Sequence, residues 1–468
     1  MPFPSSSSAP PFVLTRSLKS TTKDDQLFAA FPVEIRVEIF RHYIGELFPV
    51  DKTNAGPLLL LRVSRAWRNL VLHTPQLWSS FSLDVQRATV LHGQRLISAL
   101  KYWLKQSRHV SLTFKLRYPV LDTVCTKLFQ EILSASYRWR DATLHAPSAS
   151  LLSLWEAKQD SFPALRSLSV ETVGLSPFLI PDLGLNWAQL VTLDLFLITI
   201  PTLDDCLHIL EQGVNLTACS LNAVCVLDTR DPQRVIVLPK MKDLELKLYN
   251  GDHISPSETS LHAFLDKLDC PALRSFGVSW NLIDHWTQPD KLFAFLNRIG
   301  AHLESLNLGY LPLTTPQIVQ ALKAVPFLRH LSLALSQADR ENDYINNEFF
   351  RALEDTALVP RLQSVHLNCN GESFKNSSLL CFMASRWKYH GGGGQLEALD
   401  IVSPKRQAKY RPKRFQDLKE GKLDVRASLK SESSMLRVVA AYLNKDSYEM
   451  LCFMNSDFPS DIRSLLHL

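Results

Sequence analysis

Apolar residues recur along most of the chain in one short pattern, in which an apolar residue is followed three and five positions later by two more. The clearest copies are FPALRSLSV, WAQLVTLDL, GVNLTACSL, LPKMKDLEL, CPALRSFGV, GAHLESLNL, VPFLRHLSL, VPRLQSVHL and GGQLEALDI. The first apolar positions, here called the anchors, are 25 to 34 residues apart: Leu165, Leu190, Leu216, Met241, Leu273, Leu303, Leu328, Leu362 and Leu396. Two weaker copies precede them, at Leu112 with Phe114 and at Ala142 with Leu144. The closing alternation predicts a short strand with one buried face.

Between these copies lie segments with apolar residues three and four positions apart, which is the spacing of an amphipathic helix. They include LDDCLHILEQG, TSLHAFLDKLDC, KLFAFLNRIG, TTPQIVQALKAVP and NEFFRALEDT. Thr315 before Pro316 indicates the start of one such helix. A unit of one strand and one helix is too short to bury both, so neighbouring units must stack. The pattern therefore predicts an α/β fold with a parallel sheet and helices on one side.

The region before the repeats is helical and unusually apolar. Residues 31–45, FPVEIRVEIFRHYIG, predict a helix with Pro32 at its first position and Gly45 at its end. Two separate apolar stripes run along it: Val33, Val37, Phe40 and Ile44 on one, and Ile35, Ile39 and Tyr43 on the other. Together they cover roughly 200° of the helix surface, about twice the arc that one core contact requires.

A second helical region follows in LLLLRVSRAWRNLVLHTPQLW, residues 58–78, with Ser64 as a helix cap. We expect one apolar stripe along it, formed by Val63, Trp67, Leu70 and Val71. Two interpretations remain open at this point. The helices could be a buried cap on a larger core, or a small module whose second apolar face binds a partner.

Residues 29–78 resemble an F-box. The matching features are a hydrophobic-Pro pair, a Glu-Ile pair, an Ile-Phe pair, Leu-x-x-Val-x-Arg-x-Trp and a closing Pro-x-Leu-Trp. The resemblance implies a three-helix module that binds the adaptor subunit of a cullin-based SCF ubiquitin ligase. The implied adaptor-binding residues are Phe31, Pro32, Ile35, Ile39, Phe40, Leu61, Val63, Trp67, Leu70, Pro75, Leu77 and Trp78. The chain departs from the family at Phe31, where Leu is usual, at Arg36, and in a longer segment 45–57.

The repeats resemble a leucine-rich-repeat solenoid, in which strands line a concave parallel sheet and helices cover the convex side. The Asn that usually follows the strand is present in two copies, as Asn281 and Asn370, so we expect irregular curvature. An F-box before degenerate repeats is similar to F-box-like proteins of mushroom-forming fungi. The expected division is a disordered tail over 1–26, an F-box domain over 27–80, the solenoid over 81–403, and a basic insertion with a C-terminal cap over 404–468.

The residues between the apolar positions of each strand are expected to point away from the core. These candidate target-binding residues are Asp194, Phe196, Asp243, Glu245, Lys247, His330, His366 and Asp400. Four of the eight are acidic and one is a lysine, and this acidic excess disfavours nucleic acid and favours a basic or neutral protein target. Residues 404–430, in contrast, hold ten Lys or Arg against three acids. They fit either a solvated insertion or a nuclear import or phosphate-binding patch.

Composition adds little chemistry to this picture. The net charge of +5 is small for 468 residues, and the eight cysteines form no C-x-x-C pair, so we expect reduced thiols. We find no catalytic, nucleotide-binding or metal-binding motif and expect neither a cofactor nor enzyme activity. No apolar run is long enough for a membrane helix, and the N-terminus is unlike a signal peptide, which favours cytoplasm or nucleus. The resemblance to an F-box implies a substrate receptor of a ubiquitin ligase, with a plain interaction scaffold as the alternative.

Overall fold

The computed structural model describes most of residues 28–403 together with 424–427. The gaps are 29, 53, 86–89, 119, 121, 148–149, 151–160, 174–184, 197–201, 226–234, 250–257, 281–288, 336–342, 388–395 and 397. The predicted N-terminal tail, Asn281, most of the basic segment 404–430 and the C-terminal cap lie outside the described residues. The chain forms two compact units, the first of residues 1–177 and 182–186, the second of 178–181 and 187–468.

The first unit begins with three short helices, α2 (Val33–Ile44), α3 (Gly56–Val63) and α4 (Arg65–Leu72), and a 3-10 turn, η1 (Pro75–Trp78). Helix α2 ends at Gly45, as predicted, where φ is +81°. Ser64 is also confirmed as a cap, because its side chain accepts a hydrogen bond from the Trp67 amide. However, Ser64 separates α3 from α4, so the single stripe predicted to join Val63 to Trp67 is wrong: the two residues belong to different helices.

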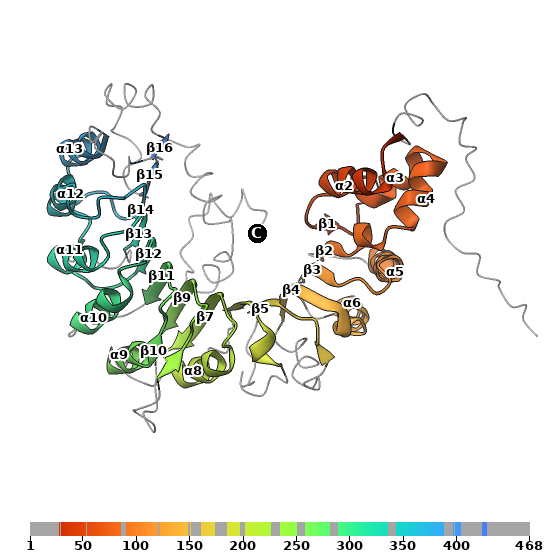
Figure 1. Ribbon diagram of the computed structural model, residues 1–468, viewed down its shortest axis with the longest axis horizontal. Helices are drawn as coiled ribbons and strands as arrows, with labels where there is room; N and C mark the ends of the chain where they lie inside the picture. Colours follow the sequence, from red (N-terminus) through yellow and green to blue (C-terminus); the bar gives the residue numbers. More distant parts are fainter. Residues whose placement is uncertain are drawn as a thin grey trace, which may run out of the picture. The chain divides into compact units, whose positions relative to one another are not determined.

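Five parallel strands complete the first unit in chain order. They are β1 (Phe48–Pro49), β2 (Ser80–Asp84), β3 (Leu112–Arg117), β4 (Trp139–Pro147) and β5 (Ser167–Val173), with helices α5 (Val90–Gln106) and α6 (Thr123–Leu133) between them (Figure 1). The two weaker copies of the repeat pattern are confirmed as β3 and β4. Strands β1 and β2 carry no copy of the pattern and were not predicted. The long segment 45–57 contains β1, which pairs with β2 from Phe48 to Phe81.

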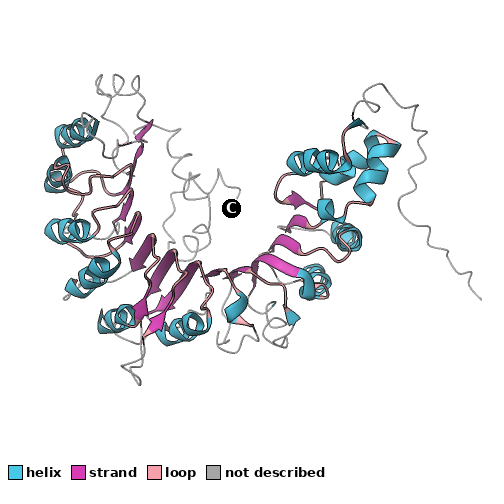
Figure 2. Ribbon diagram, in the orientation of Figure 1, coloured by secondary structure: helices cyan, strands magenta, loops and turns pink. Residues whose placement is uncertain are grey.

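The second unit is a parallel sheet with helices on one side, as Figure 2 shows by colour. Its strands, in order, are β6 (Thr192–Phe196), β7 (Ala218–Val224), β9 (Asp243–Tyr249), β11 (Ser275–Trp280), β12 (Ser305–Gly309), β13 (His330–Ala334), β14 (Ser364–Asn368), β15 (Ala398–Val402) and β16 (Asp424–Ala427). A separate pair joins β8 (Ile236–Val237) to β10 (Leu268–Asp269). The helices are α8 (Leu203–Gln212), α9 (Glu258–Asp266), α10 (Asp290–Ile299), α11 (Thr315–Ala324), α12 (Asn347–Glu354) and α13 (Asn376–Trp387). The α/β class and the five amphipathic segments quoted above are thus confirmed, as is Thr315 as the first residue of α11, which Thr314 caps.

The anchors explain why each repeat places its strand in register with the next. All nine anchors are at most 1% exposed. In seven of them the amide donates to the carbonyl three residues earlier, as in Leu273 to Cys270 (3.1 Å), which turns the chain into the next strand. The residue after the anchor then bonds to its counterpart in the preceding repeat, as in Arg274 N to Lys242 O (2.8 Å). One row of backbone hydrogen bonds therefore runs along the edge where the strands begin.

Two arginines, the exposed Arg298 and the buried Arg386, join neighbouring helices in the same way. Arg298, at the end of α10, donates to the carbonyl of Leu265 in the last turn of α9 (2.6 Å) and to that of Leu268 just beyond it (3.0 Å). Arg386, on α13, does the same for the last turn of α12 and the loop after it. Helix C-terminal carbonyls have no partners within their own helix. Each arginine supplies those partners from the next repeat.

Candidate protein-interaction surfaces

Exposed apolar side chains gather in and around α2 and α3. The described residues include fifteen large apolar side chains that are exposed, and seven of them lie between residues 31 and 63: Phe31, Val33, Ile35, Ile39, Tyr43, Leu47 and Val63. Ile35, Ile39 and Tyr43 are four residues apart and therefore share one face of α2. We call these three residues the α2 apolar stripe. They are 48%, 44% and 51% exposed.

The other side of α2 packs inside the first unit. Phe40 is 1% exposed, and its ring contacts those of Phe28 and Trp67 at centroid distances of 5.4 and 4.9 Å. Phe28 and Trp67 also meet, at 4.8 Å. We call these three residues the aromatic cluster. It joins α2 to α4, so the α2 apolar stripe is held facing away from the core.

The tryptophan at the end of the helical region attaches it to α5. Trp78 is fully buried, its Nε1 donates to the Val71 carbonyl (3.0 Å), and its ring meets that of Trp103 edge-on at 4.9 Å. The predicted adaptor-binding residues consequently fall into three groups. Phe31, Pro32, Ile35, Ile39 and Val63 are exposed; Leu61, Trp67, Leu70 and Pro75 are half-buried; Phe40, Leu77 and Trp78 are buried. Only the first group forms exposed surface, while the last belongs to the core.

In the second unit, the face of the large sheet that points away from the helices carries the predicted target-binding residues. We call it the open face. In β9, Asp243, Glu245 and Lys247 alternate with buried leucines. Asp194, Asp243 and Glu245 line a shallow groove of about 400 Å³. Gly277 borders it, and a Cβ there would approach the Glu245 side chain to 3.2 Å, so the glycine gives that side chain room.

The remaining predicted residues of the open face form cross-strand pairs. His366 Nδ1 lies 3.0 Å from Asp400 Oδ2, and His330 Nδ1 lies 2.8 Å from Ser364 Oγ. The Lys247 ammonium lies 5.3 Å from the centroid of the Phe196 ring, in cation–π geometry. The predicted residues thus share one face, but the structure brings only the acidic ones of β6 and β9 to a common groove.

Sequence reasoning overlooked a second, basic groove at the edge where the strands begin. Its cations are Lys242, Arg274, Arg329 and Arg361. A weak pattern could have indicated it: the residue directly after the anchor is basic in four of the nine repeats, at Arg166, Lys242, Arg274 and Arg329. Within a single repeat, each of these residues has the character of an ordinary surface cation, so no one repeat indicates the groove.

The buried thiols are held in their protonated form. Cys125, Cys206, Cys219, Cys225, Cys270 and Cys369 are buried thiols, and Cys381 is an exposed one. Burial raises the pKa of Cys125 and of Cys270 to about 12. Since the thiolate is the reactive form, we expect N-ethylmaleimide at pH 7.5 to modify Cys381 and to leave the six buried cysteines unmodified until urea unfolds the chain. Peptide mass spectrometry of the labelled protein checks this, and equally rapid labelling of Cys270 would contradict it.

The same pKa shifts imply a loss of stability at alkaline pH. The folded chain keeps these thiol protons to a higher pH than the unfolded chain, whose cysteines have an ordinary pKa of 9.0. Between pH 9 and 12 the folded state therefore binds more protons, and the free energy of unfolding falls as pH rises. Urea unfolding at pH 8 and pH 10 measures this change.

The described residues offer neither a metal site nor a membrane-spanning helix. They contain no group of three or more His, Cys, Asp or Glu side chains placed to hold a metal ion. Nor does any helix among them combine the length and the apolar character that crossing a membrane requires. Comparison with known proteins adds no relative: no protein-family model matches the chain, and no curated protein matches its sequence.

Proposed function

We propose that this chain is the substrate-recognition subunit of an SCF-type cullin ubiquitin ligase. In this proposal α2, α3 and α4 form an F-box that binds the adaptor, and the strand–helix repeats form a leucine-rich-repeat solenoid that binds a target protein. The observation that carries it is the α2 apolar stripe, which is exposed on a helix whose opposite side is anchored by the aromatic cluster. Exposed apolar surface concentrated in one region is typical of a binding site.

The proposed role needs no bond chemistry in this chain. A receptor raises the rate of ubiquitin transfer by holding a lysine of the target near the loaded conjugating enzyme, which is catalysis by proximity. The open face supports a basic or neutral target, because Asp194, Asp243 and Glu245 line its groove. Binding there would be steered by charge and would weaken as salt rises.

Co-purification with the ligase adaptor tests the proposal. We expect the wild-type chain to form a stoichiometric complex, and Ile35→Asp with Ile39→Asp to weaken it at least about a hundredfold, because the variant buries two carboxylates in an apolar interface. The matched control is Val214→Asp with Val235→Asp, which alters two exposed valines of the second unit. It should bind the adaptor as the wild type does.

Two results would contradict the proposal. One is adaptor binding by the stripe variant with wild-type affinity. The other is a wild-type chain that stays free of adaptor and monodisperse. The second result would favour the alternative function, a protein-interaction scaffold without a role in ubiquitin transfer, and Arg36 and the segment 45–57 would be the features to examine next.

A further inference from the structure

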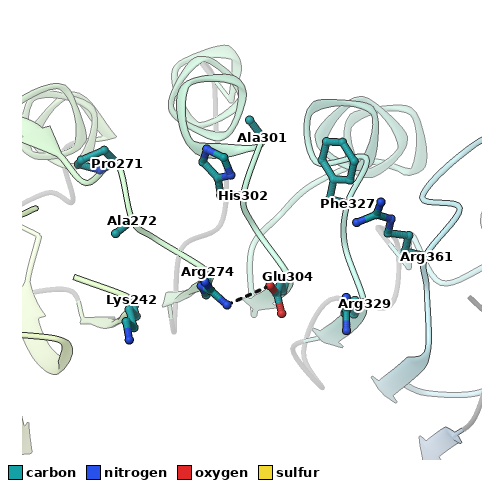
Figure 3. Close-up of a pocket in the computed structure, with 10 residues that line it drawn as sticks. All are labelled: Lys242, Pro271, Ala272, Arg274, Ala301, His302, Glu304, Phe327, Arg329 and Arg361. Atoms are coloured by element: carbon teal, nitrogen blue, oxygen red, sulfur yellow. Dashed lines mark hydrogen bonds and ion pairs between the residues drawn. The ribbon is translucent and has the colours of Figure 1, made fainter. Parts of the chain in front are cut away.

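The basic groove lies in the second unit, at the edge of the large sheet where β9, β11, β12 and β13 begin. Lys242, Arg274, Glu304 and Arg329 each stand one residue before a strand, and Figure 3 shows them in a row, with Phe327 and Arg361 beside it. The groove has a volume of about 420 Å³. It is distinct from the groove on the open face, with which it shares no lining residue.

Backbone hydrogen bonds fix the order of the row. The Arg274 amide donates to the Lys242 carbonyl (2.8 Å), Glu304 to Arg274 (2.7 Å) and Arg329 to Glu304 (2.7 Å). Adjacent strands are about 4.8 Å apart, so the row from Lys242 to Arg329 spans three spacings, about 14 Å. An extended peptide covers that length in about four residues.

The charges in the groove are mostly uncompensated. Four cations face one carboxylate, Glu304, which pairs with Arg274 at 3.4 Å. Arg361 lies over the Phe327 ring at 4.8 Å from its centroid, and this stacking orients its guanidinium. Lys242, Arg329 and Arg361 form no ion pair with any described residue. Cations held this close together attract a polyanionic ligand, and the attraction becomes stronger as the salt concentration is lowered.

We propose that this groove binds an acidic segment of a partner protein in extended conformation. Carboxylates or phosphates on alternate residues of that segment would face Lys242, Arg329 and Arg361, and guanidinium groups bind both anions with two parallel hydrogen bonds. The small volume suits a few side chains of a single strand. The proposal holds whether or not the chain binds a ligase adaptor, because α2 contributes nothing to the groove.

Fluorescence anisotropy with the full chain tests this proposal. The probes are a labelled ten-residue peptide with Glu at alternate positions, the same peptide with phosphoserine at those positions, its Gln counterpart, and a single-stranded DNA decamer. The test variant is Lys242→Glu with Arg329→Glu. The matched control is Lys291→Glu with Lys375→Glu, which makes the same change in net charge at two exposed lysines outside the groove.

We expect the Glu or the phosphoserine peptide to bind and the Gln peptide to bind at least tenfold more weakly. The test variant should bind the acidic peptide about tenfold or more weakly than the wild type does. The control variant should change that affinity by less than about twofold. The stronger of the two acidic peptides identifies the anion that the groove prefers. The proposal is overturned if neither acidic peptide binds, if both variants weaken binding equally, or if the DNA binds more tightly than the peptides and is lost in the test variant.

Discussion

Replacing Arg386 by methionine is expected to lower the free energy of unfolding of the second unit by about 3 kcal/mol, because it removes a buried guanidinium that donates to four backbone carbonyls. Arg386 is 2% exposed. Its Nε donates to Leu353 O (2.9 Å), its Nη1 to Val359 O (3.1 Å), and its Nη2 to the carbonyls of Asp355 (2.9 Å) and Leu358 (2.6 Å). Methionine fills a similar volume but can donate to none of them.

The charge of Arg386 is retained despite its burial. Burial lowers the pKa of its guanidinium to about 10, and Asp355 opposes this shift. The side chain is therefore cationic at neutral pH, and hydrogen bonds from a charged donor contribute more than neutral ones. Since the desolvation of that charge is relieved in the methionine variant, the net loss is smaller than the sum of the separate bonds.

Urea unfolding at pH 7.5 measures the effect. The matched control is Arg351→Met, which removes an exposed arginine of α12 and should change the free energy of unfolding by less than about 0.5 kcal/mol. Arg386→Lys should recover little of the loss, since one ammonium group cannot reach four carbonyls. An Arg386→Met protein as stable as the control would show that water replaces the guanidinium without cost.

Phe40→Ala is expected to lower the free energy of unfolding of the first unit by about 3–5 kcal/mol, the usual range for emptying a buried aromatic site. The variant removes the ring that contacts both Phe28 and Trp67. The loss should therefore uncouple α2 from α4. Hydrogen exchange of the amides in α2 and α4, with the amides of β12 and β13 as an internal reference, separates this local effect from unfolding of the second unit.

The neighbouring residue supplies the control for this variant. Ile39→Ala removes a side chain of comparable apolar character that is 44% exposed, and it should change stability by less than about 0.5 kcal/mol. Adaptor binding should respond differently, because Ile39 belongs to the α2 apolar stripe. If Ile39→Ala destabilised the first unit as much as Phe40→Ala, the stripe would be part of a core rather than a surface for a partner.

The repeat pattern alone was sufficient to predict most strands and helices. Copies at Leu165 through Leu396 predicted β5 to β15 apart from the short β8 and β10, and the anchors are all buried. This works because the alternation of a strand and the three-to-four spacing of a helix are local properties, set by which side chains must leave water. Strands β1 and β2 were missed since Phe48 and Phe81 belong to no repeat, and their pairing depends on contact with the rest of the unit.

The candidate surfaces were predictable only in part. The sequence by itself determined that α2 has two apolar stripes, that the repeats stack, and that acids outnumber bases on the open face, because each follows from residue spacing within one element. Tertiary structure alone decided that Phe40 is covered while Ile39 is not, and that Arg386 reaches the carbonyls of another repeat. It also decided that Lys242 and Arg329, 87 positions apart in the chain, share one groove. Burial and shared surfaces depend on which distant elements pack together, and no local spacing specifies that.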